Sequence, residues 1–262
     1  MMKNFVKGLA VAGALLLSAP ALAGSGKPTV VLVHGAFADA SSWNGVIQRL
    51  EKDGYSVVAA ANPLRSVRGD ADSVASLIDS IKTPVVLVGH SYGGSVISEA
   101  ATGKANVQAL VYVAAFAPET GETAIGLSGK FPGSTLGPTL APPVPLSGGG
   151  KDLYIQQAKF PDQFAADVPK AEARLMAATQ RPIAEAALGE ASTEPAWKTI
   201  PSWFVYGDKD RNIPPQALAF MAERAHSKQT VVVKGASHVV MVSNPAAVAK
   251  LIETAAQASP AK

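Results

Sequence analysis

The sequence contains no cysteine among its 262 residues. Disulfide bonds, thiolate nucleophiles and cysteine-ligated metals are therefore excluded. Charged residues make up only 16% of the chain, and 23 basic residues nearly balance 20 acidic ones. A nucleic-acid surface needs a concentrated excess of basic residues, so we expect no nucleic-acid partner. Without crosslinks, a chain of this length must depend on a large buried core, which one α/β domain can provide.

The N-terminus differs from the rest of the chain. Lys3 and Lys7 precede an apolar run over residues 9–19, and Ala21-Leu22-Ala23 follows Pro20. A basic start, an apolar centre and an A-x-A site predict a signal peptide over residues 1–23, cleaved after Ala23. The apolar run is short for a bilayer span and no charged stop-transfer segment follows it, so we expect no stable membrane anchor after cleavage. The sequence thus predicts a periplasmic or secreted protein.

One stretch organises the remaining sequence. Four apolar residues at 85–88 predict a strand buried on both faces, and they run directly into Gly89-His90-Ser91-Tyr92-Gly93. This G-x-S-x-G pattern is typical of a tight strand-to-helix turn that presents a nucleophilic serine. The amides at the start of the following helix favour negative charge that develops nearby. Ser91 is therefore the candidate nucleophile.

Strands and helices alternate on both sides of this stretch. Such alternation, with strands that are apolar throughout, predicts a mainly parallel sheet with helices on both faces. We assign residues 24–116 and 197–262 to this core. The expected strands are 29–33, 56–60, 85–88, 107–116, 201–206 and 230–233, and the expected helices are 41–50, 70–81, 215–224 and a closing helix from Asn244-Pro245.

Between residues 117 and 196 the alternation is lost. Residues 131–150 contain five prolines and five glycines, which disfavour regular structure. Helices are expected at 152–159, 170–179 and 183–188. An insertion of helices and loops between two core strands predicts a cap over Ser91, because a long structureless loop is otherwise rare in a compact domain. The candidate residues for the substrate pocket are Phe37, Phe160, Phe164, Met176 and Val239, with packing between cap and core as the alternative for each.

A serine nucleophile needs a base, and the base needs an acid to orient it. Ser91, Asp210 and His238 each follow a predicted strand, and parallel strands bring these ends to one edge of the sheet. We expect His238 to take the Ser91 proton and Asp210 to hold the imidazole. Asp208 and Glu119 also follow predicted strands and are alternatives for the acid.

The first strand leads into His34-Gly35-Ala36, where a backbone amide can face the serine. We assign the oxyanion hole to the N–H groups of Ala36 and Tyr92. His34 and His90 are expected to shape their loops rather than to transfer protons. No cofactor or metal is needed for this chemistry.

The motifs Val-Leu-Val-His-Gly-Ala, Val-Gly-His-Ser-Tyr-Gly-Gly and Ser-His-Val-Val-Met resemble those of α/β-hydrolases, in particular the plant methylesterase and hydroxynitrile lyase branch and its bacterial relatives. The resemblance implies an α/β-hydrolase fold with an inserted helical cap, and a serine carboxylesterase acting on a small to medium ester. It implies Ser91, Asp210 and His238 as the triad. The lyases carry a lysine directly after the catalytic histidine, whereas this chain has Val239, which favours ester hydrolysis.

Three other functions stay open at this point. A cofactor-free perhydrolase or haloperoxidase would use the same triad with peroxide as acyl acceptor. Hydroxynitrile lyase activity is disfavoured by Val239, and a non-enzymatic binding protein is disfavoured by the complete set of catalytic motifs. The sequence leaves open the acyl and alcohol parts of the substrate and the oligomeric state.

Overall fold

A six-stranded sheet forms the centre of the protein, in the order β2-β1-β3-β4-β8-β9. The computed structural model describes residues 26–258, and the predicted signal peptide lies outside this range. All neighbouring strands of the sheet are parallel, which confirms the expected sheet. The strands are β1 (Thr29–Val33), β2 (Val57–Ala60), β3 (Val85–His90), β4 (Val107–Val113), β8 (Ser202–Gly207) and β9 (Thr230–Val233).

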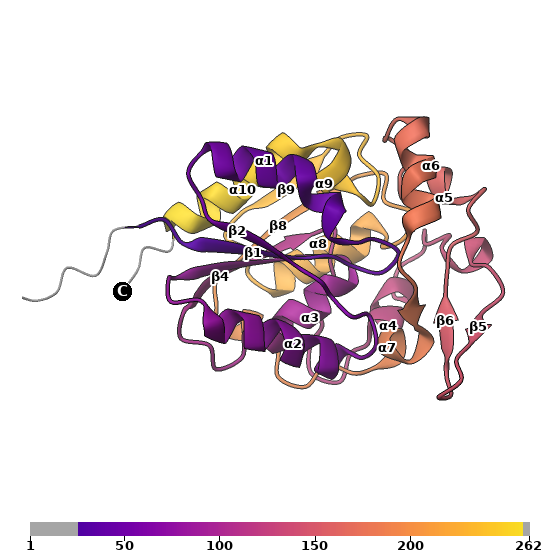
Figure 1. Cartoon of the computed structure of the whole chain (residues 1–262), viewed down its shortest axis with the longest axis horizontal. Coiled ribbons are helices and arrows are strands. Elements are labelled where there is room, and N and C mark those ends of the chain that lie inside the picture. The colour runs from indigo at the N-terminus through magenta and orange to yellow at the C-terminus, as the bar shows by residue number, and fades with distance from the viewer. Residues whose placement is uncertain (1–25, 259–262) are drawn as a thin grey trace, which may run out of the picture.

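The central strands are apolar because both of their faces are covered. Every residue of β1, β3 and β8 is buried, as expected for a parallel sheet between two helical layers. The helices α1 (Asn44–Lys52) and α10 (Pro245–Ala258) pack together on one face, and α2 (Val67–Ser80) and α3 (Tyr92–Ala100) pack on the other (Figure 1). The helix α8 (Pro215–Arg224) packs against β8.

One helix begins earlier than expected, and another begins at the turn that holds Ser91. The helix α2 begins at Val67 rather than Asp70, because the Ser66 hydroxyl accepts a hydrogen bond from the Gly69 amide and caps the helix. The helix α3 begins at Tyr92, directly after the serine. Within residues 26–258, no helix combines the length and the apolar character needed to cross a bilayer.

Residues 117–196 leave the sheet after β4 and return to it before β8, at one end of the molecule (Figure 1). Two of their short strands pair on either side of a third, in a separate antiparallel sheet with the order β5-β6-β7. We call residues 117–196 the cap. Its elements are α4 (Ala124–Gly129), the 3-10 helix η2 (Gly137–Thr139), β5 (Val144–Pro145), β6 (Lys151–Leu153), α5 (Phe160–Phe164), α6 (Lys170–Thr179), β7 (Ile183–Ala184), α7 (Glu185–Gly189) and the start of η3 (Ala196–Lys198).

The expected helix over residues 152–159 is wrong. Residues 151–153 instead form β6, in which Asp152 pairs with Val144 on one side and Ala184 on the other. The proline- and glycine-rich stretch also contributes a strand, β5, at the edge of this small sheet. Proline is tolerated there because an edge strand needs fewer amide donors. The expected helix at 183–188 begins only at Glu185, after β7.

Three ion pairs of the described residues attach the cap to the core, and one of them joins Glu119 to Lys198. Arg65, in the loop after β2, lies 2.7 Å from Asp152 of β6. Arg224, at the end of α8, lies 2.8 Å from Glu122, before α4. These ion pairs join segments far apart in the sequence, and backbone hydrogen bonds such as that from the Ala184 amide to the Leu64 carbonyl oxygen add to them.

Candidate active site

Ser91 lies at the turn between β3 and α3, with a backbone φ of 53° and ψ of −124°. A positive φ is unfavourable for a residue with a side chain, so the surrounding structure must hold it in place. A Cβ at Gly89 would lie 2.6 Å from the Gly93 carbonyl oxygen, and a Cβ at Gly93 would lie 2.6 Å from the Val33 carbonyl oxygen. Close backbone contacts therefore require both glycines of the motif.

The imidazole of His238 is held by a buried carboxylate. Its Nδ1 lies 2.7 Å from Asp210 Oδ2, and both side chains are almost fully buried. The second oxygen of Asp210 accepts hydrogen bonds from the amides of Asn212 and Ile213, at 2.8 and 3.0 Å. A carboxylate at Nδ1 selects the tautomer with its proton there, which leaves Nε2 as the basic nitrogen.

The two alternative carboxylates lie elsewhere. Asp208 accepts a hydrogen bond from the Gly235 amide at 2.6 Å. Glu119 pairs with Lys198 at 2.5 Å, and this partner holds the pKa of Glu119 below its ordinary value. Of the three acids that the sequence offered, only Asp210 contacts His238 within the described part of the chain.

Ser91 and His238 line one cavity of about 700 Å³ between the sheet edge and the cap. No hydrogen bond joins the Ser91 hydroxyl to the His238 ring among residues 26–258. Such bonds are often long in ligand-free enzymes and shorten when substrate binds. The residues that the cap contributes to the cavity are mostly apolar: Ala124, Ile125, Leu136, Leu140, Pro142, Pro143, Leu153, Phe164 and Leu188.

Ala36 and Tyr92 also line this cavity. The neighbouring amide of Phe37 donates to the Arg181 carbonyl oxygen at 3.0 Å. Among the described residues, the Ala36 and Tyr92 amides donate to no backbone carbonyl oxygen. The first amides of a helix lack partners within the helix, so the Tyr92 N–H is available to a ligand.

The Tyr92 side chain reaches away from the serine to a buried acid. Its hydroxyl donates to Asp70 Oδ2 at 2.9 Å, and the Arg65 amide donates to the same carboxyl group. Burial raises the pKa of Asp70 despite these hydrogen bonds. No motif marks Asp70 in the sequence, because it lies in an ordinary amphipathic helix. This contact fixes the residue that carries one of the two candidate oxyanion amides.

The other two histidines near the serine are structural. His34 Nε2 accepts a hydrogen bond from the Asn62 amide at 3.1 Å, and burial lowers the pKa of His34. His90 Nε2 lies 3.2 Å from the His238 carbonyl oxygen, and burial, followed by the proximity of His238, holds the pKa of His90 well below its ordinary value. Neither ring lines the cavity, so both support the loops around it.

The helix α5 of the cap packs on the catalytic histidine candidate. The Phe164 ring lies 5.1 Å from the His238 ring and 6.1 Å from the Phe37 ring, between ring centroids, and both phenylalanines line the cavity. Phe160 packs behind Phe164 at 4.8 Å and is fully buried. The structure therefore places Phe37 and Phe164 in the cavity wall and Phe160 in the layer behind it.

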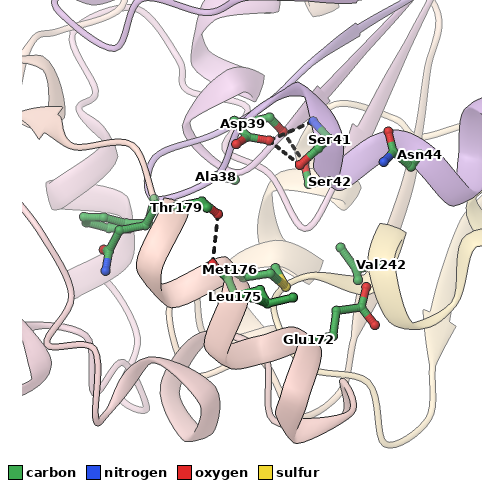
Figure 2. A pocket seen from close by; sticks show the side chains of 12 residues that line it. Ala38, Asp39, Ser41, Ser42, Asn44, Glu172, Leu175, Met176, Thr179 and Val242 are labelled. Atoms are coloured by element: carbon green, nitrogen blue, oxygen red, sulfur yellow. Dashed lines mark hydrogen bonds between the residues drawn. The ribbon is translucent and has the colours of Figure 1, made fainter.

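Two further candidates for the substrate pocket lie away from the Ser91 cavity. Val239 is fully buried beside His238 in the sequence and does not line the cavity. Met176, on α6, lines a separate cavity of about 200 Å³ between α6 and the start of α1. Figure 2 shows Met176 and Leu175 facing Val242 across this smaller cavity. Met176 is not among the residues that line the Ser91 cavity.

A loop residue of the cap that the sequence analysis missed holds the segment before His238. Asp167 accepts hydrogen bonds from the Ser237 amide, at 3.0 Å, and from the Ser237 hydroxyl. No motif marks Asp167, and its role follows only from the folded chain. Within residues 26–258, no group of three or more His, Asp or Glu side chains is arranged to hold a metal ion.

These features agree with the comparison to protein families. Residues 30–251 match the model of the alpha/beta hydrolase family. The chain belongs to the α/β-hydrolase family. An alpha/beta hydrolase of Aspergillus novofumigatus is 25% identical over 250 residues, which cover 88% of this chain and 97% of that protein. The alpha-hydroxynitrile lyase of Arabidopsis thaliana is 25% identical, over 82% of this chain and 92% of the lyase.

Solved structures of other proteins are similar in fold to this α/β-hydrolase. Polyneuridine aldehyde esterase superposes with a TM-score of 0.76 at 19% identity, over 87% of this chain and 98% of the esterase. An extracellular alpha/beta-hydrolase from a Paenibacillus species superposes with a TM-score of 0.68 at 23% identity, over 87% of this chain and 98% of that one. At these identities the likeness concerns the fold, and the chemistry must be argued from the site.

Proposed function

We propose that this α/β-hydrolase is a serine carboxylic ester hydrolase that acts through an acyl-enzyme. The observation that carries the proposal is the shared cavity of Ser91 and His238, in which Asp210 holds the imidazole with Nε2 as its basic nitrogen. Esterases among the proteins of similar fold support it, polyneuridine aldehyde esterase being one.

The reaction follows from the geometry in two halves. His238 Nε2 takes the Ser91 proton as the serine oxygen attacks the ester carbonyl carbon, and the amides of Ala36 and Tyr92 stabilise the oxyanion. The C–O bond to the alcohol then breaks, and His238 returns the proton to the leaving alkoxide. Water, deprotonated by the same imidazole, attacks the acyl-enzyme and releases the carboxylic acid and the free serine.

The size and polarity of the cavity favour a small to medium ester with an apolar body. A cavity of about 700 Å³ holds a small organic molecule rather than a polymer. The apolar wall from the cap favours burial of hydrocarbon beside the ester group. The expected partner is therefore a small-molecule ester.

Hydrolysis of p-nitrophenyl butyrate by the purified protein and by Ser91→Ala tests the proposal. We expect the variant to lose at least about three orders of magnitude in kcat/KM and to keep the circular dichroism of the wild type. A fluorophosphonate probe should label the wild type at Ser91 and leave the variant unlabelled. Equal rates for the two folded proteins would refute serine catalysis.

The similarity to a hydroxynitrile lyase makes lyase activity the second candidate. Val239 follows His238 and is fully buried, so this position offers no cation to stabilise a leaving cyanide. Release of cyanide from mandelonitrile, faster than ester hydrolysis, would favour the lyase. Halogenation of monochlorodimedone in acetate and peroxide would show the perhydrolase reaction on the same serine.

We also propose that the protein is exported and acts in the periplasm or outside the cell. The basic and apolar N-terminal sequence and the A-x-A site before Gly24 support this proposal. N-terminal sequencing of the protein from its natural host tests it, with Gly24 expected as the first residue.

A further inference from the structure

Asn212 lies at a junction between the candidate triad and the cap. Its amide donates to Asp210 Oδ1, and its carbonyl oxygen accepts hydrogen bonds from the hydroxyls of Ser128 and Ser134, at 3.0 and 2.9 Å. The residue is 4% exposed and lines the cavity that contains Ser91. Both backbone polar groups of Asn212 are therefore satisfied, and its position beside the acid is fixed.

The hydrogen-bond network also fixes the orientation of the Asn212 side chain. Gln163, on α5, donates through Nε2 to the Arg211 carbonyl oxygen at 3.0 Å and to Asn212 Oδ1 at 2.8 Å. A carbonyl oxygen can only accept, so the Gln163 atom beside it must be the nitrogen. Gln163 Oε1 accepts in turn from the Thr135 hydroxyl. The Asn212 atom that faces Gln163 must then be its oxygen, which leaves Nδ2 as a free donor.

Asn212 Nδ2 is buried and has no hydrogen-bond partner. Several buried side-chain atoms of the described residues are unpaired, but only this one belongs to a residue that lines the Ser91 cavity. A buried amide donor without an acceptor is unfavourable, and such atoms in folded proteins usually have a partner. Asn212 lines the cavity, so an acceptor on a bound ligand would reach Nδ2 from that side, once the groups that cover this atom in the ligand-free structure shift.

Each of the other side-chain donors in the cavity wall, outside the candidate triad, already donates a hydrogen bond within the protein. Ser128 and Ser134 direct their hydroxyl protons at the Asn212 carbonyl oxygen. The Gln156 amide donates to the Leu140 carbonyl oxygen at 2.9 Å. Glu185 carries only acceptors when ionised. Gln156 Nε2 uses one of its two hydrogens in this way, whereas Asn212 Nδ2 is the buried side-chain donor of the described cavity wall that has no acceptor for either hydrogen.

We propose that Asn212 is a specificity residue, whose Nδ2 donates a hydrogen bond to an oxygen that the ester substrate carries away from its scissile carbonyl. The scissile carbonyl oxygen is taken by the amides of Ala36 and Tyr92, so the acceptor is a second oxygen, such as a ketone or an ether. The preferred substrates are then oxo- or alkoxy-substituted esters with an otherwise apolar body. This inference rests on the esterase function proposed above.

Two matched pairs of esters test the inference and locate the acceptor. Methyl levulinate and methyl isocaproate differ by a ketone oxygen in place of a methyl group in the acyl half. Methoxyethyl butyrate and butyl butyrate differ by an ether oxygen in place of a methylene in the alcohol half. We define the oxygen preference as the ratio of kcat/KM within each pair, measured by pH-stat titration. Intrinsic differences in reactivity cancel when this ratio is compared between variants.

The variant Asn212→Asp replaces the free NH₂ group by oxygen and keeps the acceptor for Gln163. We expect the oxygen preference to fall about three- to tenfold in one of the two pairs, as for the loss of one hydrogen bond. Any effect of the added charge on His238 acts on both members of a pair and leaves the ratio unchanged. Asn44→Asp, at the exposed start of α1, is the matched control and should keep the wild-type ratios.

Gln163→Leu provides a second, independent variant. It removes the group that fixes the Asn212 amide, so the amide can turn its oxygen to the cavity, and the oxygen preference should fall without any change of charge. If the wild type hydrolyses both pairs and neither variant alters either ratio, Asn212 does not contact substrate and the inference is wrong. Failure of the esterase proposal is a separate result, because it appears as activity that survives in Ser91→Ala.

Discussion

The sheet core and the cap hold their functional residues in place by different means. In the core, Ser91 follows β3, Asp210 follows β8 and His238 follows β9, so the ladder of a buried parallel sheet brings all three together. In the cap, the small sheet has short and partly exposed strands. Side-chain hydrogen bonds, ion pairs and scattered backbone hydrogen bonds position its residues. The core supplies the candidate reacting groups, and the cap supplies most of the apolar wall of the cavity.

Two contacts show that the cap also acts on residues of the core. The Phe164 ring of the cap packs on the His238 ring, and Asp167 of the cap holds Ser237. The cap therefore supports the base as well as the wall. Three variants, described in order of the size of their expected effects, test how far the two regions act separately.

The largest effect is expected within the core, from Asp210→Asn. An asparagine amide cannot hold the Nδ1–H tautomer of His238 as the carboxylate does, so kcat should fall about 10³- to 10⁴-fold. The rate of p-nitrophenyl butyrate hydrolysis measures this loss. Asp208→Asn is the matched control, because Asp208 contacts the Gly235 amide rather than the imidazole. An equal loss in both variants would contradict the assignment of Asp210.

An intermediate effect is expected from the cap, in Phe164→Ala. Removal of a buried phenylalanine ring destabilises a fold by about 3–5 kcal/mol, and urea denaturation measures this change. Because His238 also loses a packing neighbour, kcat/KM of the folded variant should fall by about ten- to a hundredfold. Phe160→Ala removes an equally buried ring of the same helix that does not line the cavity. It should destabilise as much and reduce kcat/KM less.

The smallest effect is expected at an attachment of the cap to α3, in Glu99→Gln. Glu99 accepts hydrogen bonds from the Thr193 amide, at 2.8 Å, and from the hydroxyls of Ser192 and Thr193. Burial opposes ionisation of Glu99, but these hydrogen bonds outweigh it and lower its pKa below 4.5. The group is only partly buried, so we expect a loss of about 1 kcal/mol, or about 2–4 °C in Tm, at neutral pH.

The sign of the pKa shift at Glu99 predicts how this loss depends on pH. A lowered pKa in the folded state means that the ionised group stabilises the fold above its unfolded pKa. The stabilisation is lost as the pH falls through the lowered value. The difference in Tm between wild type and Glu99→Gln should therefore shrink on acidification below about pH 4.5. A difference that is constant with pH would show that the carboxylate does not act by its charge. Glu51→Gln, at an exposed residue of α1, is the control variant.

The core was predictable because its signals are local. Runs such as residues 85–88 are apolar without alternation, which only a strand covered on both faces requires. The expected strand at 230–233 and helix at 215–224 match β9 and α8 in their bounds. The cap was less predictable, because β6 is three residues long and its pairing with β5 and β7 depends on segments elsewhere in the chain. A pattern of three residues cannot distinguish a strand from a helical turn.

The candidate active site was likewise predictable in part, where motifs mark its residues, and unpredictable where distant contacts decide. The motif order placed Ser91, Asp210 and His238 at strand ends, but the sequence offered Asp208 and Glu119 beside Asp210, and only the distance of 2.7 Å to His238 separates them. In the sequence, Phe164 and Met176 were equal candidates for the substrate pocket. The folded chain turns the first to His238 and the second to the smaller cavity of Figure 2.

The sequence by itself determined the parallel sheet, the strained turn at Ser91 and the set of groups that can react there. These depend on backbone hydrogen bonding and on steric limits, which a few neighbouring residues express. Only the tertiary structure decided which acid holds His238, which cap residues face Ser91 and which amide hydrogen of Asn212 is left without a partner. Those outcomes depend on contacts between residues distant in the chain, as between Gln163 and Asn212, and no local pattern encodes them.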